Sequence, residues 1–145
     1  MGDRSNIVIQ QRDGGRVFLY GHWLGAQALE VVAEVIRRGD RLDDESYLAR
    51  IVFATMTRGE ETGATGFGIS AGYAPDSNRP HIVLDVPSQT AHLEADGWMT
   101  LEHFSHSAGD QMTRPVPFAD FALACESTGF DYDALVSLLP VEVSA

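Results

Sequence analysis

Two short β-branched runs separated by a glycine turn place the strongest constraint on how this chain can fold. Residues 6–11 and 16–21 are rich in valine, isoleucine and aromatic residues, and they flank Arg12-Asp13-Gly14-Gly15. An Asp-Gly or Gly-Gly pair between two such runs is typical of a tight β-hairpin, because these residues readily adopt positive φ angles. We therefore predict that the chain begins with an antiparallel hairpin.

Two amphipathic helices are predicted after this hairpin, over residues 26–38 and 44–57. In both segments apolar residues recur at helical spacing, so that they form one stripe facing the core. Gly39 can supply the left-handed residue that ends the first helix, and Asp43 or Asp44 can cap the start of the second. The residues expected to form the buried stripes are Leu29, Val32, Val35, Ile36, Leu48, Ile51, Val52 and Thr55.

The rest of the chain is predicted to alternate between turns, strands and short helices. The glycine-rich segment 59–72 leads into a strand, and 81–86 forms another. Residues 90–95 and 98–104 flank Asp96-Gly97, which predicts a second hairpin. Short helices are expected over 118–126 and over 131–139, the latter capped by Asp131.

These elements together indicate an α+β fold in a single domain, 1–140, followed by a flexible tail, 141–145. We expect an antiparallel sheet built from N-terminal and C-terminal hairpins, packed by the two central helices and completed by the short C-terminal helices. The lone cysteine, Cys125, lies in an apolar stretch and is expected to be a buried, inert thiol.

The charge of the chain is strongly negative and unevenly distributed. The net charge is −11, of which residues 1–80 carry −2 (nine Arg, eleven acids) and residues 81–145 carry −9 (one Arg, ten acids). An acidic half repels nucleic-acid phosphates, so we expect no direct nucleic-acid binding. The acidic half would suit a basic protein partner, as in a nucleic-acid mimic, or would simply keep the protein in solution.

Nothing in the sequence predicts a membrane location. The apolar runs are far too short to span a bilayer, and the first six residues lack the basic and apolar regions of a secretory signal. We expect a cytoplasmic protein.

Three short motifs resemble a family of small, uncharacterised bacteriophage and prophage proteins. In order, they are Arg4-Ser5-Asn6-Ile7, Tyr20-Gly21-His22-Trp23-Leu24-Gly25 and Arg58-Gly59-Glu60. The resemblance covers about the first 65 residues, and Leu24 departs from it because the family commonly has an acidic residue there. It implies a phage or prophage origin, with the host cytoplasm as the location, and a site around the motifs, but it does not imply a reaction.

The motif side chains favour a binding site for a planar or anionic small molecule. Arginine forms forked hydrogen bonds to anions, and tryptophan stacks on planar rings. The alternative is structural: Trp23 anchors the core, His22 is hydrogen-bonded at a sheet edge, and Arg58 forms an ion pair with Glu60. The residues predicted to bind the ligand are Arg4, Asn6, His22, Trp23, Arg58 and Glu60.

A second cluster raises the question of a metal site. On the predicted second hairpin, His92 and His103 would share a face with Glu94, and two histidines with a carboxylate can bind Zn or Fe. The spacing to His106 does not fit a continuing strand, and the helical His-Glu-x-x-His order is absent, so we assign no metal or cofactor.

The sequence thus favours a small phage-type binding or modulating protein over an enzyme. It would capture a host protein or a small host-derived molecule. The alternatives are a small hydrolase, metal-dependent or not, that uses His22 or the His92/His103 face, and an acidic mimic that blocks a host DNA-binding protein. Exposed edge strands would also allow a homodimer.

Overall fold

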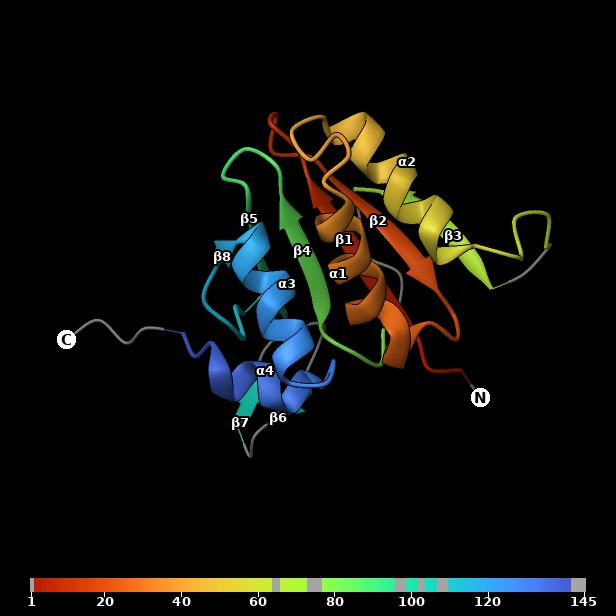
Figure 1. Ribbon diagram of the computed structural model, residues 1–145. Helices are drawn as coiled ribbons and strands as arrows, with labels where there is room; N and C mark the ends of the chain where they lie inside the picture. The colour runs from red at the N-terminus through yellow and green to blue at the C-terminus, as the bar shows by residue number, and fades with distance from the viewer. Residues whose placement is uncertain are drawn as a thin grey trace.

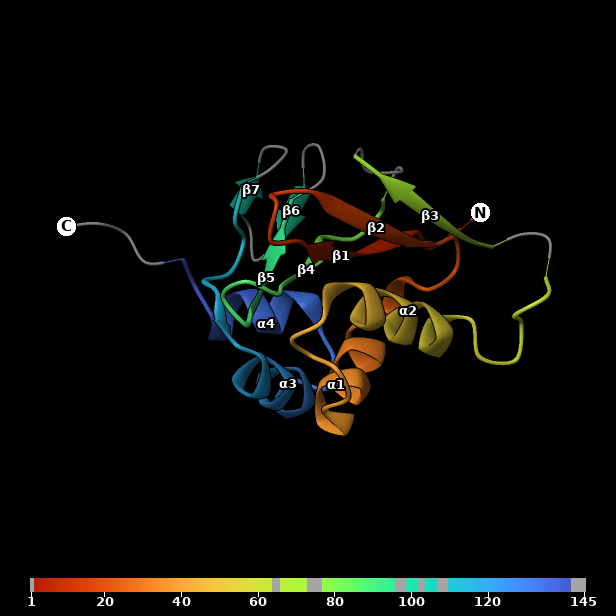
Figure 2. The ribbon, with the colours of Figure 1, turned by 90° about the horizontal axis from the view of Figure 1, so that it is seen from above.

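The computed structural model describes residues 2–63, 66–72, 77–95, 99–101, 104–106 and 110–141, and within them the fold is α+β. A six-stranded mixed sheet is covered on one side by the helices, and a separate two-stranded sheet lies near one end of it, next to the last helix (Figures 1 and 2). The elements are β1 (Ser5–Gln10), β2 (Arg16–Gly21), the 3-10 helix η1 (Gly25–Gln27), α1 (Ala28–Arg38), α2 (Glu45–Met56), β3 (Phe67–Ala71), β4 (His81–Asp85), β5 (Thr90–Glu94), β6 (Met99–Leu101), β7 (Phe104–His106), β8 (Val116–Pro117), α3 (Phe118–Ser127) and α4 (Tyr132–Leu138).

The N-terminal hairpin is confirmed, but the sheet is not purely antiparallel. Strand order is β3-β2-β1-β4-β5-β8, and β1 pairs antiparallel with β2, with Asn6 opposite Tyr20. On its other edge β1 pairs parallel with β4, with Ile7 in register with Ile82. The prediction of a purely antiparallel sheet was wrong because β1 and β4 are joined through β2, both central helices and β3, a crossover that lets them run in the same direction.

The predicted hairpin between 90–95 and 98–104 is also wrong. β5 has β4 on one edge and β8 on the other, while β6 pairs with β7 in a separate two-stranded sheet. The second edge of β5 is occupied by the chain after β7, since the Met112 amide donates to the Leu93 carbonyl at 2.9 Å. The turn residues 96–98 lie outside the described residues.

The helices follow the predicted periodicity and caps closely. The Asp44 carboxylate accepts the Tyr47 amide, the Asp131 carboxylate accepts the Ala134 amide, and Gly39 ends α1 with φ of 71°. The first helix begins two residues later than predicted, after η1. The predicted core residues are buried except Thr55, which is half-buried, while its neighbour Met56 is buried.

The core lies between the sheet and the helices and draws on both halves of the chain. Ile9 and Leu19 from the first hairpin and Leu93 from β5 are fully buried, as is Phe121 of α3. Cys125 belongs to this core, as predicted, and burial raises the pKa of its thiol to about 12, which keeps it protonated and unreactive. The acidic half of the chain is therefore an integral part of the fold.

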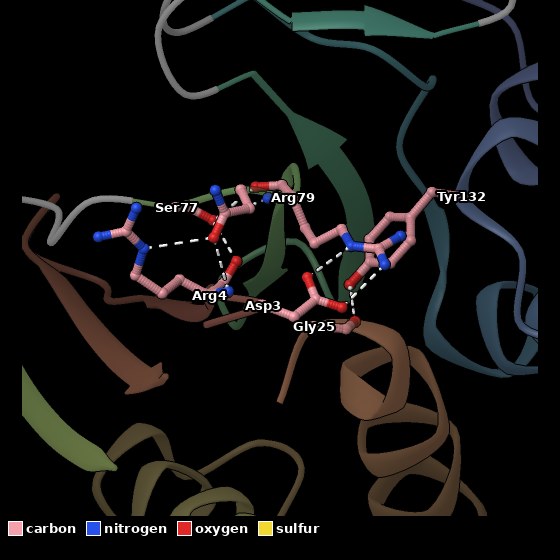
Figure 3. A network of polar contacts seen from close by, with 7 residues as sticks. Asp3, Arg4, Gly25, Ser77, Arg79 and Tyr132 are labelled. Carbon is pink, nitrogen blue, oxygen red and sulfur yellow. Dashed lines mark hydrogen bonds and ion pairs between the residues drawn. The ribbon is translucent and has the colours of Figure 1, made fainter. Parts of the chain in front are cut away.

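A polar network joins the chain start to the loop before β4 and to α4 (Figure 3). The Arg79 guanidinium donates to both carboxylate oxygens of Asp3 at 2.9 Å, and the same guanidinium lies 5.4 Å from the centre of the Tyr132 ring. The Tyr132 hydroxyl donates to the Gly25 carbonyl at 3.0 Å. The hydrogen bond from Arg79 lowers the pKa of Asp3, although partial burial acts in the opposite direction.

Gly25 is required where this network meets the first helix. Its amide donates to the Asp3 carbonyl at 2.8 Å, and a Cβ at this position would come 2.1 Å from the Asp3 carboxylate. Since Arg79 holds that carboxylate in place, it could not move aside without losing the ion pair. The glycine that ends the Tyr-x-His-Trp-x-Gly motif thus has a structural reason.

We predict that Gly25→Ala lowers the free energy of unfolding by about 1–3 kcal/mol, the usual cost of overpacking. Gly68→Ala is the matched control, because a Cβ there meets no atom within 4 Å and the residue has no positive φ. Urea denaturation of both variants measures the difference. Equal stability of the two variants would show that Asp3 relaxes freely.

Candidate functional site

Three of the six predicted ligand-binding residues line one cavity at the end of the β2–β3 pair. This cavity, called here the Trp23 pocket, has a volume of about 420 Å³, within the usual range for small-molecule sites. It lies where η1, the segment after α2 and the start of β3 meet. Its lining residues are Trp23, Leu24, Gln27, Met56, Arg58, Glu60, Gly66 and Phe67.

Trp23 is displayed at the surface, so the interpretation of it as a core anchor is wrong. Its side chain is 62% exposed. The His22 ring packs edge-on against the indole with ring centres 4.4 Å apart, and Gly66 lies beside the indole, since a Cβ on Gly66 would be 3.4 Å from Cζ3. The Gly66 carbonyl accepts the His22 amide at 2.8 Å, which fixes this arrangement. The indole is thus held by its neighbours while much of its surface stays open to a ligand.

Arg58 and Glu60 do not form the ion pair with each other that the structural interpretation expected. The Arg58 guanidinium instead binds both carboxylate oxygens of Glu34 on α1, and this hydrogen bonding raises the pKa of Arg58. Within the described part of the chain no side chain pairs with the carboxylate of Glu60, which is exposed. The pocket therefore places two charged groups beside one indole: the Arg58 guanidinium, which is bound to Glu34, and the Glu60 carboxylate.

The other three predicted residues do not line the pocket. Arg4 belongs to the chain-start region shown in Figure 3, where its backbone amide and Nε both donate to the Asn78 side-chain oxygen, at 2.9 and 3.3 Å. Asn6 is completely buried within β1. His22 acts behind Trp23: its Nδ1 lies 2.9 Å from the Tyr20 hydroxyl, and Gly2 packs against its Nε2 edge. We interpret these three residues as supports of the site.

Sequence reasoning missed Gln27, Met56 and Phe67 as lining residues. Phe67 directly follows Gly66, and β3 pairs with β2 so that Phe67 faces Gly21 across the ladder. Had that pairing been known, the register alone would have placed Gly66 beside His22, next to Trp23. Gln27 and Met56 carry no local signal, because each lies at the end of a helix whose position depends on packing.

The predicted metal cluster is only partly described, because His103 lies outside the described residues. His92 Nε2 lies 3.4 Å from a Glu94 oxygen on the same face of β5, as predicted for that pair. Both Glu94 oxygens, however, accept hydrogen bonds from the Arg16 guanidinium, at 2.7 and 2.9 Å. A carboxylate already neutralised by a guanidinium is a poor ligand for a divalent cation. No group of three metal-binding side chains occurs among the described residues.

Comparison with protein-family models, curated proteins and solved structures finds no match for the chain. The resemblance of the three motifs to phage proteins therefore remains a prediction. No helix in the described ranges is long and apolar enough to cross a membrane.

The Arg16–Glu94 pair gives a testable dependence of stability on pH. Burial raises the pKa of Glu94, but hydrogen bonds from His92 and Arg16 outweigh it and lower the pKa to about 2, from 4.5. Because the folded pKa is depressed, the stabilisation is complete above about pH 4.5 and is lost as the pH falls toward about 2. We predict that Glu94→Gln lowers the free energy of unfolding by about 2–3 kcal/mol near neutral pH. In this variant the free energy of unfolding should also fall less steeply between about pH 4.5 and about pH 2.

Urea denaturation across that pH range measures both effects. Glu126→Gln is the control, because Glu126 forms an exposed ion pair with Arg37 and should contribute far less. If the free energy of unfolding of Glu94→Gln fell with decreasing pH as steeply as that of the unmodified protein, the lowered pKa of Glu94 would not be the cause.

Proposed function

We propose that this chain is a small phage-type binding protein that captures a planar molecule derived from the host in the Trp23 pocket. The observation that carries this proposal is the exposed indole of Trp23, held in place by His22 and Gly66, with the Arg58 guanidinium lining the same cavity. An exposed aromatic face flanked by a guanidinium and a carboxamide is suited to a planar ring with polar edges, and Arg58 binds Glu34 through Nη1 and Nη2.

The side chains of the pocket favour binding over catalysis. His22, which could act as a general base, has Tyr20 at one ring nitrogen and Gly2 at the other. Arg58 stays protonated at all relevant pH values, and its pKa is raised further by Glu34. Gln27 and Glu60 supply donors and acceptors that could read the edge of a bound ring.

We predict that Trp23→Ala weakens ligand binding by about 1–3 kcal/mol, the usual loss when a stacking aromatic is removed, while the fold survives because the side chain is largely exposed. Leu123→Ala is the matched control, since Leu123 is 58% exposed on α3. Native mass spectrometry of untagged protein exposed to a host small-molecule extract would show a bound mass that the control retains and Trp23→Ala loses.

A mass retained equally by both variants would place the ligand outside the Trp23 pocket. A protein-only mass after exposure to the extract would contradict the capture of a small molecule and leave a host protein as the partner.

A further inference from the structure

Four of the ten arginines of this acidic chain line a single groove next to the Trp23 pocket. The groove runs along one face of α2 and has a volume of about 590 Å³. It contains Arg38, Arg41, Arg50 and Arg58, with Tyr47 between them, and is called here the arginine groove. Arg58 lines both cavities, so the two are adjacent.

The arginines of the groove differ in how far they are already engaged. Arg38 pairs with Asp40 at 3.2 Å on the surface, and Arg58 is held by Glu34. Arg50 is exposed and forms no hydrogen bond or ion pair with any described residue. Its guanidinium can therefore form a full fork with an incoming anion.

Arg41 is fixed in place by an unusual backbone. Its φ of 56° lies in the left-handed region, which a residue with a side chain adopts at some cost. In this conformation its guanidinium stacks 4.4 Å from the centre of the Tyr47 ring. The stack holds a second cation at the groove, so that less side-chain freedom is lost when an anion binds.

The charge of the whole chain limits what this groove can accept. The net charge is −11, and Asp40 and Glu61 lie within the groove itself. A long polyanion would extend beyond the arginines and meet repulsion, whereas a short one would contact only the cations. The local chemistry therefore favours a compact phosphate group over a nucleic-acid strand.

We propose that the arginine groove is a phosphate subsite, and that the captured molecule is nucleotide-like, with its ring against Trp23 and its phosphates along the groove. This inference rests on the proposed function, because the ring would occupy the Trp23 pocket. Arg58 lies where the two halves of the ligand meet. Arg50 lies within α2 and lines the groove but not the Trp23 pocket, so we assign it to the outer phosphates of the ligand.

Isothermal titration with ATP, AMP, adenosine and inorganic tripolyphosphate tests the subsite, and the other three ribonucleoside triphosphates cover the choice of base. We expect ATP to bind more tightly than AMP, AMP more tightly than adenosine, and tripolyphosphate to bind alone with a strong dependence on salt. Arg50→Gln should weaken ATP and tripolyphosphate binding by about tenfold to a hundredfold, the loss typical of a charged hydrogen bond, and leave adenosine unchanged.

Arg114→Gln is the matched control, because it removes the same charge from the C-terminal half and should change none of these affinities. Circular dichroism confirms that each variant is folded. Trp23→Ala should weaken adenosine and ATP but not tripolyphosphate.

The outcomes separate the two proposals. Equal affinity for adenosine and ATP, with no binding of tripolyphosphate, overturns the phosphate subsite and leaves the Trp23 pocket as a ring site. Tripolyphosphate binding that Arg50→Gln abolishes, with no added affinity from any of the four bases, supports the subsite and overturns the proposed function. A single-stranded oligonucleotide that binds more tightly than every triphosphate overturns the assignment to a compact ligand.

Discussion

The burial of β1 on both faces and its pairing on both edges is the constraint on which the rest of this structure depends. From Ser5 to Ile9 every residue of the strand is buried. Ile7 and Ile9 lie in the core under the helices, while Val8 lies on the other face in a small cluster with Phe18 and Val83. β1 is thus a central strand of the sheet, and the helices cover the face that carries Ile7 and Ile9 (Figure 2).

The position of the candidate site follows from the pairing of the strands and the packing of α2. Gly21 at the end of β2 faces Phe67 at the start of β3, and the next residues outward on the two strands bring His22 and Trp23 against Gly66. Arg58, two residues after the end of α2, lines the same pocket as Trp23 and Gly66. Each binding side chain therefore lies where a regular element begins or ends, on a rigid scaffold that leaves the side chain itself exposed.

The residues of the three sequence motifs divide into two roles. Gly25 makes room for the Asp3 carboxylate, Arg4 fastens the start of β1 to the loop before β4, and Asn6 is buried within the central strand. These three residues stabilise the fold around Trp23 and Arg58, which line the candidate site. The strongly acidic second half supplies three strands of the main sheet and two of the helices, and the acids Asp120, Glu126, Asp131 and Asp133 of its helical region are exposed.

The sequence by itself determined what depends on neighbours a few residues apart: the turn at Gly14, the cap at Asp44, the buried stripes of the helices and the inert Cys125. It also indicated three residues of the candidate site, Trp23, Arg58 and Glu60, because the motifs are local. Only the tertiary structure decided that β1 and β4 run parallel, that Trp23 is exposed, that Arg58 pairs with Glu34, and that four arginines line one groove. These features join residues tens of positions apart, and their distances are set by how the helices and strands pack, which no local pattern of side chains records.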